Sequence, residues 1–173
     1  AKEELEEAKK KLKKAIYGRK LEFPGLAVRL VDEGVVGGVL WEVARAKLGT
    51  GSLMFNVTGK VYYGPELEYF AHIALKVAEN VTKKKLEKTD VVFTIINPYK
   101  EPLLVEGGSG SAAQCAAIIA LIRGLEWNRS VVVTGVIEED GRIGPVGGVV
   151  EKVVAAAIEG LRLVLVPKGQ LPS

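Results

Sequence analysis

The chain has 173 residues, 48% hydrophobic and 26% charged, which suits one globular domain with its own core and excludes a disordered chain. One cysteine (Cys115) excludes a disulfide framework or a cysteine-rich zinc site, and one histidine (His72) argues against a histidine metal site or a Ser-His-Asp triad. The net charge of +3 is too small to indicate nucleic-acid binding, and no apolar run approaches the roughly 18 residues of a membrane span. Any catalysis is therefore expected from Ser, Thr, Lys, Asp or Glu.

The N-terminal segment is rich in Glu and then Lys. Residues 1–17 predict a charged helix with a thin apolar stripe, and its charge order complements the helix dipole. We interpret residues 1–22 as a solvated helix and linker, with binding to an anionic surface as the alternative, and residues 23–173 as the folded domain.

The first part of that domain reads as β structure. Strands are predicted at residues 26–32, 37–46 and 52–60, separated by glycine-containing turns, as a mostly antiparallel meander. An amphipathic helix over 65–88 follows, with Pro65 near its start and lysines loading its C-terminal end. His72 lies inside this helix and is expected to be a surface or partly buried residue.

The second part alternates strands and helices with short connections. Strands are predicted at 90–96, 130–138 and 161–168, and helices at 111–124 and 146–160, the last ending at Gly160. The helix at 111–124 is small and apolar nearly all round, so we expect it to be central and buried. The order predicts an α+β single domain, with a β-rich first half and a layered α/β second half.

A glycine-rich loop leads directly into the helix predicted at 111–124. Ser109 lies in this loop between Gly108 and Gly110. Backbone N–H groups at the start of a helix favour negative charge, so the loop could hold a phosphate or stabilise the oxyanion formed when the serine attacks a carbonyl. The alternative is a serine that merely caps the helix.

A second segment, residues 141–152, carries a turn rich in glycine and ends on Lys152. This lysine lies in the first turn or so of the last predicted helix, among valines and alanines. The positive end of the helix dipole and apolar neighbours both lower the pKa of a lysine, and a neutral amine can act as a general base. The alternative is a lysine that extends to solvent.

Together these segments resemble the proteolytic domain of the Lon protease family. Residues 141–152 match that family's G-x-[IV]-x-P-[IV]-G-G-[LV]-x-x-K motif, and Ser109 precedes Lys152 by the typical 43 residues. The Thr134-Gly135 pair and the strand at 161–168 also match. The resemblance covers about residues 24–168, is closest to the archaeal-type branch, and is more specific in the second half.

The resemblance implies a ribosomal-protein-S5-domain-2-like fold and a Ser-Lys dyad. Ser109 is implied as nucleophile, Lys152 as general base and Thr134 as the hydroxyl that orients the amine. Glu106 takes the place of the acidic residue before the serine. The implied reaction is peptide hydrolysis through an acyl-enzyme, which needs no metal or cofactor.

Three positions near the serine complicate this assignment. Many family members have Pro or Asp before the nucleophile and Ala after it, whereas this chain has Gly108 and Gly110, which would loosen the loop and lower turnover. Ser111 is a rival nucleophile, although its spacing to the lysine is 41. Cys115 has no basic partner in its apolar helix and is not expected to react.

Two other functions stay open at this point. A GHMP-type small-molecule kinase also has a glycine-serine-alanine loop that opens a buried helix, although it would give Lys152 no role. A catalytically weak or inactive binding module would keep the fold and lose the reaction, and Gly108 and Gly110 are its support.

The resemblance also implies partners. Lon proteases couple cleavage to an AAA+ ATPase, and this sequence has no G-x-x-x-x-G-K-[ST] phosphate loop, so ATP and Mg²⁺ would act only through a separate or upstream module. We expect unfolded proteins or peptides as substrates, a hexameric ring as in the family, and no nucleic-acid partner. A cytoplasmic location is expected, with any membrane anchor lying outside this chain, and low Gln and Asn usage favours a thermophilic source.

Overall fold

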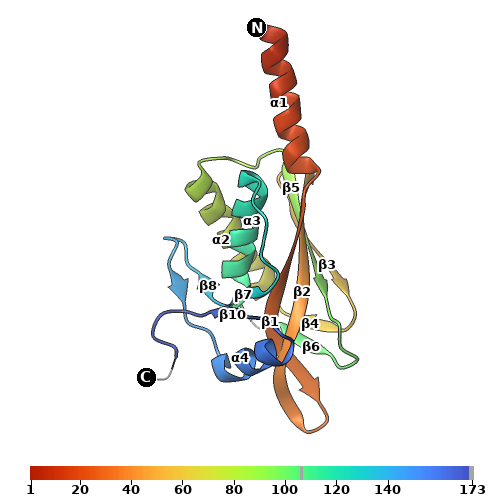
Figure 1. The fold of residues 1–173 in the computed structure, drawn as a ribbon, viewed down its shortest axis with the longest axis vertical. Helices are drawn as coiled ribbons and strands as arrows, with labels where there is room; N and C mark the ends of the chain where they lie inside the picture. The colour runs from red at the N-terminus through yellow and green to blue at the C-terminus, as the bar shows by residue number, and fades with distance from the viewer. Residues whose placement is uncertain (106, 172–173) are drawn as a thin grey trace.

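The computed structural model describes residues 1–105 and 107–171, apart from the side chains of residues 12–15. Helices and strands alternate as an α+β domain, which confirms the predicted fold class (Figure 1). In chain order the elements are α1 (Lys2–Tyr17), β1 (Lys20–Val31), β2 (Gly34–Leu48), β3 (Leu53–Thr58), β4 (Val61–Tyr63), α2 (Glu66–Thr82), β5 (Thr89–Ile96), β6 (Leu103–Val105), α3 (Ser111–Arg123), β7 (Val131–Val133), β8 (Val136–Ile137), β9 (Ile143–Gly144), α4 (Val149–Ile158) and β10 (Leu163–Leu165).

The main sheet has the strand order β3-β5-β2-β1-β6-β4. The strands β1 and β2 form a long antiparallel hairpin, in register from Lys20↔Arg45 to Val31↔Gly34. The predicted meander is wrong at the third strand, because β5 lies between β2 and β3 and pairs parallel with β3. Burial explains the order: β5 is buried along most of its length and suits the interior, whereas β3 is half exposed and suits an edge.

The helices α2 and α3 lie side by side on one face of this sheet (Figure 1). The predicted central helix is confirmed as α3, whose buried alanines belong to the same core cluster as the aromatic pair Phe23 and Phe93. These two rings meet edge to face at 6.5 Å, a favourable aromatic geometry. The helix α2 ends six residues earlier than predicted, because Lys83 adopts the left-handed conformation with φ 55°. The lysines that follow therefore lie in the loop.

The predicted strand at 130–138 is interrupted. Its first part, β7, pairs parallel with β10, and its last part, β8, pairs antiparallel with β9. The interruption falls at Thr134 and Gly135, whose backbone groups bond elsewhere. The Thr134 N–H donates to the carbonyl of Leu165 at 3.0 Å, and the Gly135 N–H donates to the carbonyl of Ser109 at 2.9 Å.

The helix α4 packs against the β1–β2 hairpin. It begins at Val149, three residues later than predicted, because Gly148 has φ 64°. A side chain at Gly37 of β2 would collide with the carbonyl oxygen of Glu151, so the glycine permits close contact between strand and helix.

The helix α1 projects from the body of the domain (Figure 1). Its described side chains from Lys2 to Lys11 are exposed, as predicted for a solvated helix, and Ile16 at its root is buried. None of the helices in the described residues is both long enough and apolar enough to span a bilayer.

Candidate active site

One cavity of about 390 Å³ brings together the two residues singled out in the sequence. Both Ser109 and Lys152 line it, although 43 residues separate them in the chain. Glycines of the loop before α3 and of the turn before α4 form part of the wall. The remaining wall is mainly apolar, formed by Ala27, Val28, Val35, Leu104, Val136 and Val146.

The loop that carries Ser109 is fixed from both sides. On one side, Gly107 adopts the left-handed conformation with φ 52°, which turns the chain after β6. On the other side, the Ser109 carbonyl accepts a hydrogen bond from the Gly135 N–H, and the Gly135 carbonyl accepts one from Ala112 at 3.1 Å. The interrupted strand therefore holds the serine at the N-terminal end of α3, where the helix dipole is positive.

Ser111 is a structural residue. Its side chain is 2% exposed, and its hydroxyl donates to the Gly108 carbonyl at 2.6 Å and accepts from the Ile137 N–H at 2.8 Å. It does not line the cavity. The geometry thus favours Ser109 over Ser111 as the nucleophile.

The glycine before the serine has a packing role. A Cβ at Gly108 would lie 2.5 Å from the ring of Phe70, which projects from α2. The loop is therefore packed against an aromatic ring at this point, and lower turnover from Gly108 stays a prediction. At Gly110, by contrast, a Cβ would meet nothing within 4 Å, and φ is −89°.

Lys152 occupies the first turn of α4, where its N–H donates to the Gly148 carbonyl at 3.0 Å. Its side chain is 5% exposed. The alternative of a lysine that extends to bulk solvent is therefore wrong, and this buried residue lines the cavity that Ser109 also lines.

Most of the chain matches a known protein family. A sequence model of the Lon protease (S16) C-terminal proteolytic domain matches residues 10–172. The chain belongs to this family.

The relatives are Lon proteases of archaea and bacteria. The chain is 30% identical over 151 residues to the archaeal Lon protease of Archaeoglobus fulgidus, covering 85% of this chain and 23% of that protein. It is 32% identical to that of Thermoplasma acidophilum, covering 83% and 22%, and 30% identical to the Lon protease of Methylocella silvestris, covering 86% and 18%. The chain thus spans about a fifth of the length of the curated relatives it matches.

The supporting residues inferred from the Lon resemblance have different positions. Thr134 is 3% exposed, and its hydroxyl makes no hydrogen bond within the described part of the chain. Gly110 lines a smaller cavity behind the serine loop. Glu106 lies outside the described residues. Burial raises the pKa of the Cys115 thiol to about 11, which disfavours the reactive thiolate.

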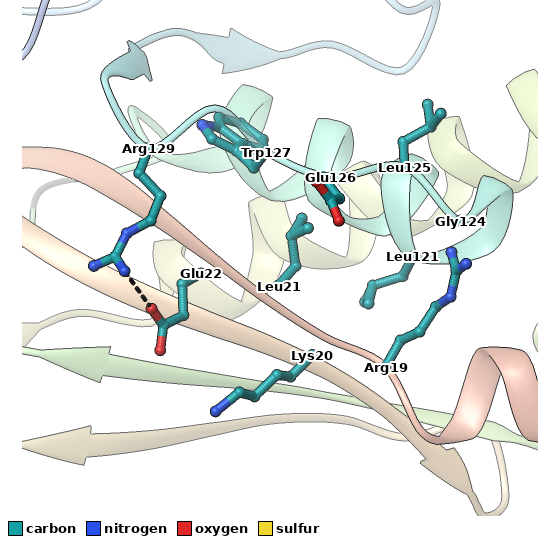
Figure 2. A pocket seen from close by; sticks show the side chains of 10 residues that line it. All are labelled: Arg19, Lys20, Leu21, Glu22, Leu121, Gly124, Leu125, Glu126, Trp127 and Arg129. Carbon is teal, nitrogen blue, oxygen red and sulfur yellow. Dashed lines mark ion pairs between the residues drawn. The ribbon is translucent and has the colours of Figure 1, made fainter.

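A second hollow, of about 430 Å³, lies at the other end of α3 (Figure 2). Arg129 forms an ion pair with Glu22 at 3.2 Å there, and the guanidinium of Arg19 lies against Gly124, which caps the C-terminus of α3. The helix dipole is negative at this end, which would oppose a developing oxyanion. A developing oxyanion is therefore better placed in the cavity at the N-terminus of α3 than in this hollow.

Sequence reasoning missed one pair near the site. Glu42 on β2 is buried, and its Oε1 accepts a hydrogen bond from Gln114 Nε2 at 3.1 Å. The alternation of the strand could have indicated this burial. Side chains two residues apart in a strand point to the same face, so in the strand predicted at 37–46 Glu42 faces the same side as the buried residues Leu40 and Ala44.

Proposed function

We propose that this chain is a serine peptidase that hydrolyses peptide bonds through a Ser109–Lys152 dyad. The observation that carries this proposal is the shared cavity: a hydroxyl at the positive end of a buried helix and an enclosed lysine line the same mainly apolar hollow. The family supports it, because the relatives named above are proteases.

The reaction begins with the neutral Lys152 amine, which removes the proton from the Ser109 hydroxyl. The alkoxide attacks the substrate carbonyl and forms a tetrahedral oxyanion at the N-terminus of α3. The Ser111 N–H is committed to the Gly108 carbonyl at 2.8 Å, so the oxyanion donors are expected earlier, around residues 108–110. The lysine then passes its proton to the leaving amine, and water hydrolyses the acyl-enzyme.

Thr134 is proposed to orient the lysine amine. Its buried hydroxyl has hydrogen-bonding capacity that the described residues do not use. A hydroxyl buried without a partner is costly, so a bond formed when the lysine moves during the reaction would satisfy it.

The substrate is proposed to be an unfolded polypeptide or a peptide. A hollow of about 390 Å³ has room for one or two side chains and the extended backbone between them, but not for a folded surface. Its aliphatic wall favours an apolar side chain beside the scissile bond, and a bound substrate that displaces water from the hollow would strengthen the electrostatic interactions of the dyad.

Assembly and energy coupling are proposals from the family. We propose a homo-oligomer, a hexameric ring, that receives substrate from an AAA+ ATPase module, which alone would use ATP and Mg²⁺. The dyad itself requires neither. A cytoplasmic location is proposed, since the single cysteine leaves no pair for a disulfide.

The test compares three variants on casein and on a short fluorogenic peptide. Ser109→Ala and Lys152→Met, which keeps the buried volume, should each lower kcat by roughly a thousandfold or more with the fold intact by circular dichroism. The matched control is Ser111→Ala, which should lose stability and still cleave. The rate should also rise with pH as the lysine deprotonates.

Other outcomes identify the alternatives. If Ser111→Ala is inactive while Ser109→Ala is as active as the wild type, the nucleophile is Ser111. If the wild type shows no hydrolysis that depends on Ser109, even with an AAA+ partner, the chain is a non-catalytic member of its family. Micromolar ATP binding that survives Lys152→Met would support a kinase.

A further inference from the structure

A much smaller cavity lies behind the loop that carries Ser109. Its volume is about 20 Å³, enough for one water molecule. Glu42 and Gln114 line it together with Gly110, the residue after the serine. The rest of its wall is apolar or glycine, formed by Gly25, Leu26, Leu40, Leu67, Ile95, Val105 and Ala113.

Packing does not explain an acid at this place. Glu42 is 3% exposed and Gln114 is 1% exposed, and no ion pair in the described part of the chain involves Glu42. Burial raises the pKa of Glu42 to about 7, and the hydrogen bond from Gln114 acts in the opposite direction. A leucine would fill the same space without a desolvation cost.

The hydrogen bond between these side chains joins the centre of the sheet to the start of the helix. Glu42 belongs to β2, and Gln114 belongs to the first turn of α3, 72 residues later. The Gln114 N–H donates to the Gly110 carbonyl at 3.1 Å, the first bond of that helix. Two steps therefore connect the Glu42 carboxyl to the backbone beside Ser109.

The other bonds at the start of α3 run to β8 and the residues just before it, not to the main sheet: the Ser111 hydroxyl accepts from the Ile137 N–H, and the Ala112 N–H donates to the Gly135 carbonyl. The N-cap, Gly110, offers no side-chain hydrogen bond, and the residues that follow Ser111 are alanines. Small side chains interlock weakly with a sheet, so they fix the rotation and register of a helix poorly. A directional bond in a buried place fixes both.

We propose that Glu42 and Gln114 form a positioning pair that fixes the first turn of α3, and with it the Ser109 hydroxyl, relative to the sheet. The proposal rests on the proposed peptidase function for its kinetic consequence. A reacting group displaced by about 1 Å can lose on the order of a hundredfold in rate, so a partial loss of alignment should lower kcat with little effect on KM.

The experiment uses a double-mutant cycle in the full chain. Glu42→Leu and Gln114→Leu should each lower kcat about tenfold with KM within about twofold, and the double variant should be no worse than either single variant. Glu42→Gln, which keeps a hydrogen-bond acceptor, should retain wild-type kcat. If a single variant fails to fold, the double variant, which buries no unpaired polar group, still tests the prediction of a tenfold loss.

A matched control separates positioning from stability. Leu86→Ala removes a buried side chain of the same core, in the loop between α2 and β5, and should lower stability while leaving kcat unchanged. If Glu42→Leu or the double variant retains wild-type kcat, or if effects of the single variants add in full, the proposal is wrong.

A readout independent of activity distinguishes this proposal from the proposed function. Amide hydrogen exchange at Gln114 reports the first bond of α3 directly. Glu42→Leu should accelerate it by at least tenfold relative to Leu86→Ala, and Glu42→Gln should not. Unchanged exchange overturns the positioning pair, whereas a wild type without hydrolysis overturns only the peptidase.

Discussion

A methyl group at Gly108 tests how the loop that carries Ser109 is held. In Gly108→Ala, the added carbon would lie 2.5, 2.6 and 2.9 Å from three ring atoms of Phe70. Carbon atoms in contact are normally about 3.5–4.0 Å apart, so the overlap is close to 1 Å. The nearest ring atom is Phe70 Cγ, close to the backbone, and Tyr69 contacts the ring edge to face at 5.1 Å, so turning the ring relieves only part of the overlap.

The magnitude follows from that overlap. Overpacking of this kind costs about 1–3 kcal/mol of unfolding free energy. If the loop yields instead of the ring, the Ser109 hydroxyl moves by a distance that costs roughly a hundredfold in kcat. Urea unfolding and peptide hydrolysis measure the two effects separately.

Two further variants make the interpretation specific. Gly110→Ala adds the same methyl group where nothing lies within 4 Å, and it should raise stability by about 0.4–1 kcal/mol through the unfolded state. Adding Phe70→Ala to Gly108→Ala should make the pair less destabilised than the sum of the single effects by at least about 1 kcal/mol. Wild-type stability and kcat in Gly108→Ala would refute the reasoning.

Two other predictions concern α4 and Glu42. Gly37→Ala should lower the free energy of unfolding by about 1–3 kcal/mol and reduce kcat, because its methyl group displaces the α4 backbone at Glu151, next to Lys152. The control is Gly147→Ala, which has nothing near its added carbon and should change stability by less than about 0.5 kcal/mol. Equal effects of the two variants on stability would contradict this prediction. Burial raises the pKa of Glu42 from 4.5 to about 7, so the folded state binds this proton more tightly than the unfolded chain does. The free energy of unfolding of the wild type, relative to that of Glu42→Gln, should therefore fall by roughly 3 kcal/mol as pH rises from 4.5 to 7, and then level off. Urea unfolding from pH 4 to 8 measures this difference, and a constant difference would show that Glu42 titrates normally.

Local patterns in the sequence predicted the parts of the site that local physics determines. The alanine-rich segment at 111–123 could only be a buried helix, and the motif at 141–152 placed Lys152 at the start of α4. The pairing of Ser109 with Lys152 came from spacing that resembles a family, and the shared cavity agrees with it.

Contacts between distant segments were beyond the sequence. The sequence at 130–138 has the pattern of one strand. In the structure, however, the Thr134 N–H donates to the Leu165 carbonyl and the Gly135 N–H donates to the Ser109 carbonyl, so the strand is interrupted where consecutive residues bond to different segments. The packing of Phe70 on Gly108 likewise depends on how α2 lies over the loop. Such bonds leave no periodic trace in either segment.

The interruption between β7 and β8 has a mechanical consequence. The adjacent backbone N–H groups of Thr134 and Gly135 bond to β10 and to the Ser109 loop respectively, so the two segments are held by the same short stretch of backbone. A displacement of β10 at Leu165 would therefore change the hydrogen bonds that hold the backbone of Ser109, two residues away along this path.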